Sequence, residues 1–116
     1  MNGSTKILIA DDDAMVRTTV SKILEMFGHR VHSVSDGSGV MAAVDDSYDV
    51  IVLDINMPGM NGLELLKWIK GNYPELQVAM ISAYGDEQNQ KQAIDYGCDD
   101  YITKPIDFSE LKEKVI

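Results

Sequence analysis

The sequence is poor in cysteine and in basic residues, and it contains no long apolar run. Its one cysteine, Cys98, excludes an internal disulfide and suits a reducing compartment. No apolar segment approaches the roughly 18 to 20 residues that span a bilayer, and residues 1–6 lack a signal peptide's apolar stretch, so we expect a cytoplasmic location. Ten basic residues stand against nineteen acidic ones, and the net charge of −9 argues against nucleic-acid or membrane binding.

What is present is typical of one globular domain. The 116 residues suffice for a core without disulfides, and the hydrophobic (45%) and charged (25%) fractions are ordinary. No repeat, low-complexity tract or linker divides the chain, so we expect a single domain over residues 1–116. The last helical pattern is short at Ile116. We leave open whether the chain stands alone or is the N-terminal part of a longer protein.

Apolar runs of three to five residues alternate with helical patterns along the chain. The runs lie at residues 6–10, 31–34, 50–53, 77–81 and 101–103, and the third and fourth are rich in Val and Ile, as strands buried on both faces are. A helical pattern follows each run. This order predicts an α/β fold with a parallel sheet, right-handed crossovers and helices on both faces.

Several side chains are predicted to face the core on these patterns. In the first helical pattern, apolar residues repeat at steps of three and four, which predicts a stripe that faces the core and ends before Gly28. In the fourth pattern only two residues are predicted to face the core. We also expect the methionines to pack in the core and loops. Trp68 is left open between a half-buried packing role and a partner contact. The residues concerned are Val16, Val20, Ile23, Leu24 and Phe27; Ala93 and Ile94; and Met15, Met26, Met57, Met60 and Met80.

Polar residues follow four of the five predicted strands. Three aspartates, residues 11–13, follow the first run, and Asp54 follows the third. Ser82 comes after the fourth run and Lys104 after the fifth. Because ligands of open α/β sheets bind beyond the carboxyl ends of the strands, we expect these side chains to converge on one edge of the sheet.

The convergence of carboxylates predicts a cation site. Two carboxylates about 4 Å apart repel by several kcal/mol at an effective dielectric of about 20, and a divalent cation relieves this repulsion. All-oxygen ligands beside a phosphate are typical of Mg²⁺, for which Mn²⁺ could substitute. With a lysine and a hydroxyl nearby, the cluster suits phosphoryl transfer, and Asp54 is the candidate nucleophile.

Taken singly, each of these residues has a plainer explanation. A triple Asp before a helix is commonly solvated capping chemistry, and a lone Asp after a strand is commonly a turn residue. Ser82 alone would be a loop hydroxyl, and Lys104 before proline a solvated charge. Four such features at four strand ends are much harder to explain in this way, and together they favour a site.

Four segments resemble the receiver domains of two-component response regulators, the CheY-like family. They are Lys-Ile-Leu-Ile-Ala-Asp-Asp-Asp at 6–13, Asp-Val-Ile-Val-Leu-Asp-Ile-Asn-Met-Pro-Gly-Met-Asn-Gly at 49–62, Ile-Ser-Ala at 81–83 and Gly-Cys-Asp-Asp-Tyr-Ile-Thr-Lys-Pro at 97–105. The resemblance covers essentially the whole chain. It implies a flavodoxin-like (βα)5 three-layer sandwich, doubly wound around a five-stranded parallel sheet of order 2-1-3-4-5.

The resemblance also implies a metal-dependent phosphoacceptor. Asp54 would accept a phosphoryl group from the phosphohistidine of a histidine kinase or histidine phosphotransfer protein. Asp12 would bind Mg²⁺ directly and Asp11 mainly through water, while Asp54 and the backbone carbonyl of Asn56 would complete the metal site. Such a protein is a regulatory domain that phosphorylates and slowly dephosphorylates itself, and is not an enzyme acting on other substrates.

The resemblance further implies a switch. Lys104 would pair with the phosphoryl oxygens, Ser82 would turn to hydrogen-bond them, and Tyr101 would change rotamer as Ser82 moves. The surface of the fourth helix, fifth strand and fifth helix would change as a result. Asn56 and Tyr84 are hypothesised to flank the path of hydrolytic water, and Pro105 is expected to follow a cis peptide. Asp13 has no direct metal role in the family and is expected to cap or tune the first helix.

Two rival functions remain at this point. The Asp-x-Asp spacing within residues 11–13 is that of haloacid-dehalogenase-like phosphohydrolases, although 116 residues are few for that fold with its cap, and Met15 stands where Thr or Val is expected. A flavodoxin-like electron carrier is the second rival, but its first loop should bind an FMN phosphate, which three carboxylates would repel. The kinase, the output, the oligomeric state and the lifetime of the phosphoryl group are not predicted.

Overall fold

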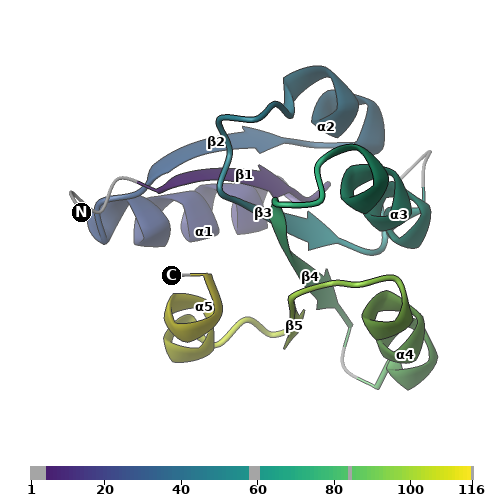
Figure 1. The fold of residues 1–116 in the computed structure, drawn as a ribbon. Helices are drawn as coiled ribbons and strands as arrows, with labels where there is room; N and C mark the ends of the chain where they lie inside the picture. The colour runs from purple at the N-terminus through teal and green to yellow at the C-terminus, as the bar shows by residue number, and fades with distance from the viewer. Residues whose placement is uncertain (1–4, 58–60, 84, 116) are drawn as a thin grey trace.

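Five strands and five helices alternate along residues 5–57, 61–83 and 85–115, the part of the chain that the computed structural model describes (Figure 1). The predicted strands agree with the observed ones to within one residue at each end. Asp54 and Ser82 are the last residues of their strands, not the first residues of the loops. In chain order the elements are β1 (Lys6–Ala10), α1 (Ala14–Met26), β2 (Arg30–Val34), α2 (Gly37–Ala43), β3 (Val50–Asp54), α3 (Gly62–Asn72), β4 (Gln77–Ser82), α4 (Glu87–Asp95), β5 (Asp100–Thr103) and α5 (Phe108–Val115).

The strands form one parallel sheet in the order β2-β1-β3-β4-β5, which confirms the predicted flavodoxin-like topology. Ala10 is paired with Leu53, Leu53 with Met80, and Ser82 with Thr103. The carboxyl ends of the four strands β1, β3, β4 and β5 are therefore level with one another. This register brings the residues that follow them to one edge of the sheet.

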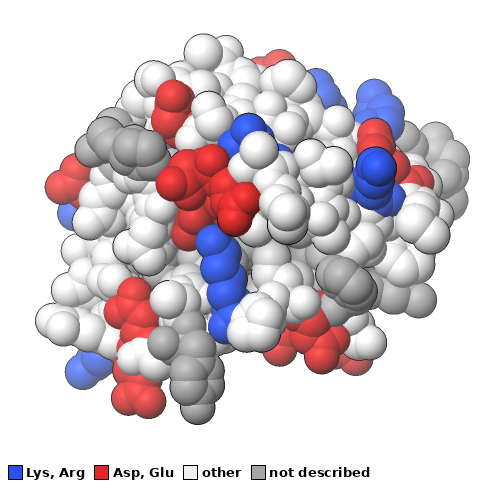
Figure 2. All heavy atoms as spheres, turned by 180° about the vertical axis from the view of Figure 1, so that it is seen from behind, with Lys and Arg blue, Asp and Glu red and all other residues white. Residues whose placement is uncertain are grey.

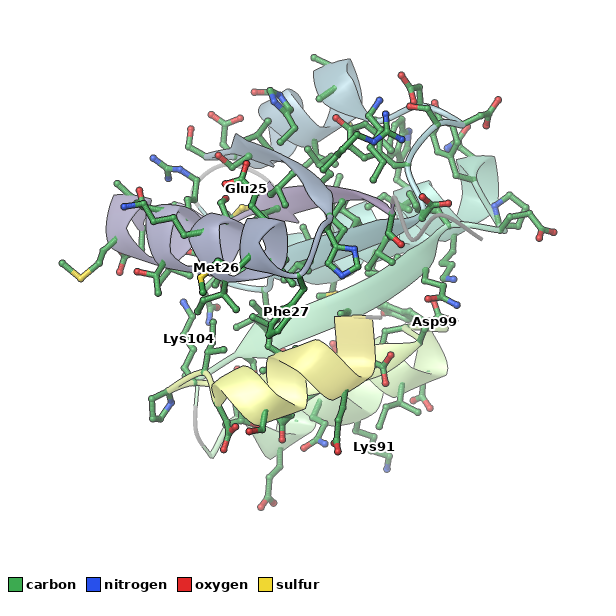
Figure 3. All side chains as sticks on the ribbon, turned by 90° about the vertical axis from the view of Figure 1, so that its left-hand side faces the viewer. Glu25, Met26, Phe27, Lys91, Asp99 and Lys104 are labelled. Atoms are coloured by element: carbon green, nitrogen blue, oxygen red, sulfur yellow. The ribbon has the colours of Figure 1, made fainter. Side chains whose placement is uncertain are left out.

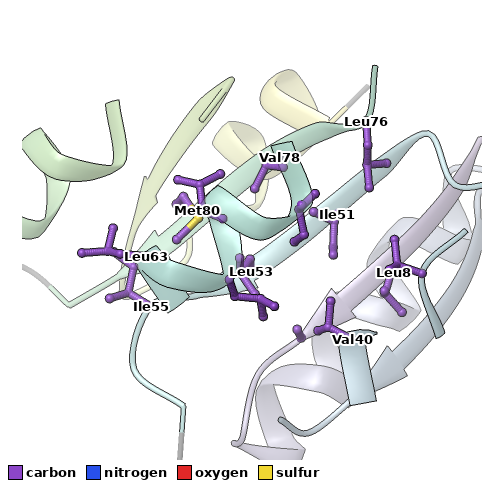
Figure 4. Packing of buried hydrophobic residues seen from close by; sticks show 14 of the residues in the cluster. Leu8, Val40, Ile51, Leu53, Ile55, Leu63, Leu76, Val78 and Met80 are labelled. Carbon is purple, nitrogen blue, oxygen red and sulfur yellow. The ribbon is translucent and has the colours of Figure 1, made fainter. Parts of the chain in front are cut away.

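Each face of the sheet carries its own apolar core, because side chains alternate between the faces of a strand. Leu8 and Leu53 lie in the core that also contains residues of α2, α3 and α4, whereas Ile7 and Val52 lie in the core shared with α1 and α5. Figure 1 shows these two helix groups on opposite sides of the sheet, and Figure 4 shows the first core from close by. The result is the three-layer sandwich expected from the alternation.

The helix ends follow the local signals in the sequence. The side chain of Asp13 accepts a hydrogen bond from the Met15 N–H at the start of α1, and Asn61 does the same for Leu63 at the start of α3. Gly28 has φ +90, so α1 ends at a backbone conformation that favours glycine. None of the described helices is both long and apolar enough to cross a membrane.

Four residues predicted to pack in the core or the loops are exposed instead. Met15, Met26 and Ile94 are 77%, 82% and 58% exposed, and Phe27 is 45% exposed. Ile94 follows the buried Ala93, and because consecutive helical residues point about 100° apart, only one of the two faces the sheet. Phe27 lies beyond the last residue of α1, and Figure 3 shows it with Met26 at that end of the helix, where the inward stripe no longer applies.

The remaining packing predictions concern three methionines and Trp68. Met57 and Met80 are buried as expected, whereas Met60 lies outside the described residues. Trp68 is partly buried on α3 and its ring meets that of Tyr73 edge-on, with centroids 6.1 Å apart. Contacts within the domain therefore bury part of the Trp68 side chain, which favours the half-buried packing role.

Gly62, at the start of α3, allows this helix to approach the end of β3. A Cβ atom at Gly62 would lie 2.6 Å from Ile55 Cα and 2.7 Å from the Asp54 carbonyl oxygen, both of which are backbone atoms. We expect Gly62→Ala to lower the free energy of unfolding by about 2 to 3 kcal/mol, measured by urea denaturation. Gly71→Ala in the same helix is the control, since its Cβ would meet nothing within 4 Å. It should be neutral or stabilise by up to about 1 kcal/mol; equal losses in both variants would contradict this account.

Candidate functional site

Four chain segments meet at the carboxyl edge of the sheet. Asp11 follows β1, Asp54 ends β3, Ser82 ends β4 and Lys104 follows β5. Asp11, Asp54 and Ser82 are at most 2% exposed, and the side chain of Lys104 is 33% exposed. The parallel register places these residues together, as the sequence predicts.

Three carboxylates form a cluster within this edge. Asp11, Asp12 and Asp54 each offer an oxygen, and the three oxygens lie within 4.8 Å of one another. Asp12 is exposed, whereas the other two are buried. Figure 2 shows an acidic patch with basic atoms directly against it on this side of the molecule. Asp13 is separate from the cluster, because its side chain caps α1 as predicted.

Lys104 lies between the two buried carboxylates. Its Nζ atom is 3.3 Å from Asp11 Oδ2 and 3.4 Å from Asp54 Oδ2. The backbone N–H of Lys104 donates to the Ser82 carbonyl oxygen, and the peptide bond to Pro105 is cis, as expected. Burial lowers the pKa of Lys104, but the Asp54 and Asp11 carboxylates outweigh this effect and produce a net rise. The lysine is therefore a fixed positive charge at neutral pH.

Burial raises the pKa of Asp54 to about 6 from the usual 3.8. The Asn56 N–H, which donates to Asp54 Oδ1 at 3.1 Å, opposes this rise, while the Asp11 charge adds to it and Lys104 reduces it. The carboxylate remains the main form above pH 6, so Asp54 can act as a nucleophile at neutral pH. Burial nevertheless disfavours the ionised form of Asp54.

The cluster fits a divalent cation. Asp11 Oδ1 accepts the Asp13 N–H at 2.9 Å, but the buried Asp11 Oδ2 accepts no hydrogen bond in the described part of the chain and has only the ion-pair contact with Lys104. Such an atom is short of a partner. Three carboxylate oxygens, two of them buried, are the donor type that Mg²⁺ prefers. Asn56, whose backbone carbonyl is the expected fourth metal ligand, lies two residues beyond Asp54.

Ser82 and Tyr101 are joined by a hydrogen bond between their hydroxyl groups. The Ser82 hydroxyl also lies 3.3 Å from the Ala83 carbonyl oxygen. Both residues line a cavity of about 330 Å³, together with Thr103 and residues at the start of α4 that include Asp86 and Gln90. The hydroxyl pair thus connects the end of β4 to β5, and the cavity beside it is also lined by the start of α4. Tyr84 lies outside the described residues.

Sequence reasoning missed Arg17. Its guanidinium Nη1 donates to the Asp11 backbone carbonyl oxygen at 2.7 Å, so α1 contributes a basic side chain to the acidic loop. One signal could have identified it: Arg17 is the fourth residue of α1, and a positive charge near a helix N-terminus is unfavourable for the helix dipole. A basic residue in the first turns of a helix therefore suggests that its side chain makes a contact outside the helix.

The fold and the edge site together define a CheY-like α/β domain with an acidic cluster, a lysine and a hydroxyl at the carboxyl ends of its strands. The family model of the response regulator receiver domain matches residues 7–116. The chain belongs to this family. It is therefore a receiver domain of the two-component response-regulator type, a regulatory rather than a catalytic unit, and receiver domains bind Mg²⁺.

Individual relatives agree with this assignment. The transcriptional regulatory protein CpxR of Klebsiella pneumoniae is 34% identical over 110 residues, which cover 95% of this chain and 47% of CpxR. The crystal structure of the receiver domain of NtrX from Brucella abortus matches with a TM-score of 0.87 and 36% identity, over 92% of each chain. A CheY-like receiver domain protein from Methanospirillum hungatei matches with a TM-score of 0.89 and 29% identity, over 96% of this chain and 90% of its own. The chain spans about half the length of the curated relatives it matches.

Proposed function

We propose that this receiver domain is a phosphorylation-controlled switch in which Asp54 accepts a phosphoryl group from the phosphohistidine of a histidine kinase or histidine phosphotransfer protein. The observation that carries the proposal is the position of Asp54. It is a buried carboxylate that lies beside two other carboxylates, and the Lys104 ammonium is 3.4 Å away. A nucleophile with cationic groups beside it is what phosphoryl transfer requires.

In the proposed reaction, an Asp54 carboxylate oxygen forms a bond to phosphorus as the phosphorus–nitrogen bond of the donor breaks. The electron pair of that bond stays on the imidazole, which is protonated and leaves as a neutral ring. Lys104 pairs with the phosphoryl oxygens, and the Asn56 N–H holds Asp54 Oδ1 in place. Mg²⁺ would be held by Asp11, Asp12, Asp54 and the Asn56 carbonyl, and when bound it supplies positive charge that neutralises phosphoryl oxygens.

The switch then passes through Ser82 and Tyr101. The Ser82 hydroxyl is drawn toward a phosphoryl group on Asp54, and its hydrogen bond to Tyr101 is replaced. Tyr101 lies on β5 and lines the same cavity as the start of α4, which supports a change that spreads to β5 and α4. We propose that the change also reaches α5. The light packing of α4 also supports this step: Ala93 is its buried residue, and Asp86 makes no side-chain cap. Elements with few buried contacts move at low free-energy cost.

Membership of the receiver family argues against the phosphohydrolase and the electron carrier as functions of this chain. Response regulators of this family work with histidine kinases, and relatives such as CpxR are transcriptional regulatory proteins about twice the length of this chain. We propose that the phosphorylated surface acts on an output region or a partner protein. A cytoplasmic location, where such kinases present phosphohistidine, stays a prediction.

The switch is tested with beryllofluoride, which mimics a phosphoryl group on a carboxylate. With Mg²⁺ and beryllofluoride present, we expect amide NMR shifts at Asp54, Ser82, Tyr101 and residues of α4 in the wild type. Asp54→Asn should show none of these shifts. Shifts that persist in Asp54→Asn, or that stay confined to the immediate neighbours of Asp54 in the wild type, would contradict the proposed switch.

A further inference from the structure

Arg17 fixes a peptide group at the centre of the acidic site. Its Nη1 atom lies 2.7 Å from the carbonyl oxygen of Asp11, a residue that is fully buried. That carbonyl belongs to the peptide plane whose other half is the backbone N–H of Asp12. A side chain that holds this plane therefore fixes the direction in which the chain enters Asp12.

Two other polar groups of Asp11, its N–H and its Oδ1, are held by other partners. Its N–H donates to the Val34 carbonyl oxygen at 3.3 Å, and its Oδ1 accepts the Asp13 N–H at 2.9 Å. Arg17 is the partner that the structure gives to the Asp11 carbonyl oxygen. A buried carbonyl without a donor costs about 1 to 3 kcal/mol, so the loop depends on Arg17 for its present conformation.

The charge of Arg17 alone does not explain why it lies there. A guanidinium near a helix N-terminus opposes the helix dipole, and a positive charge beside the carboxylates repels an incoming cation. Removing Arg17 therefore has two opposite effects on Mg²⁺ binding. Loss of the positive charge strengthens Mg²⁺ binding. Loss of the hydrogen bond to Asp11 releases the loop and weakens Mg²⁺ binding.

We propose that Arg17 is a positioning residue for the metal site: its hydrogen bond to the Asp11 carbonyl orients the Asp11–Asp12 peptide, and so sets the Mg²⁺ affinity of the cluster. The proposal rests on the proposed function, because it takes Asp11, Asp12 and Asp54 to be the Mg²⁺ ligands. Groups that orient the metal ligands by hydrogen bonds, without binding the metal themselves, typically contribute about 10- to 100-fold to metal affinity. Arg17 acts through Asp11 and Asp12 and does not itself bind the metal.

The test compares three variants by calorimetric titration with Mg²⁺ and no phosphoryl donor. Arg17→Met keeps the side-chain stem but removes both the donor and the charge, and Arg17→Lys keeps a donor and the charge. Lys22→Met removes the same charge from an exposed position on α1, away from the site. The melting temperature and the amide exchange rate of Asp13, whose N–H donates to Asp11, are measured on each metal-free protein.

We expect Arg17→Met to raise the Mg²⁺ dissociation constant about tenfold and to speed Asp13 amide exchange. Arg17→Lys should recover most of this affinity, and Lys22→Met should leave it unchanged. An unchanged Mg²⁺ dissociation constant in Arg17→Met with a lowered melting temperature would show a merely structural role. Tighter Mg²⁺ binding would show that Arg17 acts through its charge. Either result overturns the proposal.

A variant that fails to fold, and a failure of the proposed function itself, are both distinguishable from these outcomes. Should Arg17→Met fail to fold, Arg17→Gln, which removes the charge and shortens the reach to Asp11, takes its place with the same expected loss of affinity. A wild-type protein that binds no Mg²⁺ would overturn the metal site in the proposed function together with this inference. A wild type that binds Mg²⁺ as tightly as a folded Arg17→Met would overturn this inference alone.

Discussion

Mg²⁺ at about 100 times its dissociation constant is expected to stabilise the wild-type protein by about 2.7 kcal/mol, and Asp12→Ala is expected to abolish this gain. For a domain of this size the gain corresponds to a rise in melting temperature of about 10 °C. The physical reason is the clustering of oxygens from Asp11, Asp12 and Asp54 within 4.8 Å, whose repulsion the cation removes. Asp12 is the exposed member, so its removal leaves the core intact. Thermal unfolding with and without Mg²⁺ measures the effect.

The matched control for Asp12→Ala is Asp13→Ala, the adjacent carboxylate. Asp13 caps α1 through the Met15 N–H and does not belong to the cluster. Asp13→Ala should lower stability by about 1 kcal/mol through loss of the cap, but it should keep the full gain from Mg²⁺. A gain that survives in Asp12→Ala, or that disappears in Asp13→Ala, would contradict the assignment of the two aspartates to different roles.

The second large effect concerns Asp54 in the metal-free protein. Because burial raises the pKa of Asp54 from 3.8 to about 6, its ionised form is disfavoured in the folded state. A shift of this size corresponds to about 2 to 3 kcal/mol at neutral pH. Asn has the shape of the neutral carboxyl group. Asp54→Asn is therefore expected to raise the free energy of unfolding at pH 7.5 by about 2 kcal/mol.

The pH dependence of this gain has a definite sign. Between about pH 4 and pH 6 the folded wild type binds more protons at Asp54 than the unfolded chain does, so its stability falls as the pH rises through this window. The advantage of Asp54→Asn should thus be absent near pH 4 and complete above about pH 7. Urea denaturation across this range measures it, with the exposed Asp46→Asn as control. A destabilised Asp54→Asn at pH 7.5 would contradict the account of the site.

The sequence predicts the location of the site because its residues follow or end strands. Asp11, Asp54, Ser82 and Lys104 each stand at the carboxyl end of an apolar run, and a parallel sheet brings such ends together regardless of the exact strand limits. Strand ends are read reliably since burial on both faces gives continuous apolar runs. The cap at Asp13 is predicted for a similar reason, as it depends on local chain geometry alone.

The sequence does not predict the contacts that depend on the direction of a side chain. The Arg17 guanidinium reaches back six residues to a backbone carbonyl, and no periodicity encodes that contact. The bond between the Ser82 and Tyr101 hydroxyls likewise joins two rotamers chosen by local packing. The sequence does not distinguish Ile94 from Ala93, because both apolar residues fit the helical pattern equally well. Only the position of α4 on the sheet decides that Ala93 is buried and Ile94 exposed.

Phosphorylation of the protein by acetyl phosphate, followed by mass spectrometry, tests the central claim most directly. In the presence of Mg²⁺ the wild type is expected to gain one phosphoryl group on Asp54, and chelation of the metal should prevent this gain. Asp54→Asn should remain unmodified under the same conditions. A wild type that gains no phosphoryl group, or an Asp54→Asn variant that is modified equally, would contradict the assignment of Asp54 as the phosphoacceptor.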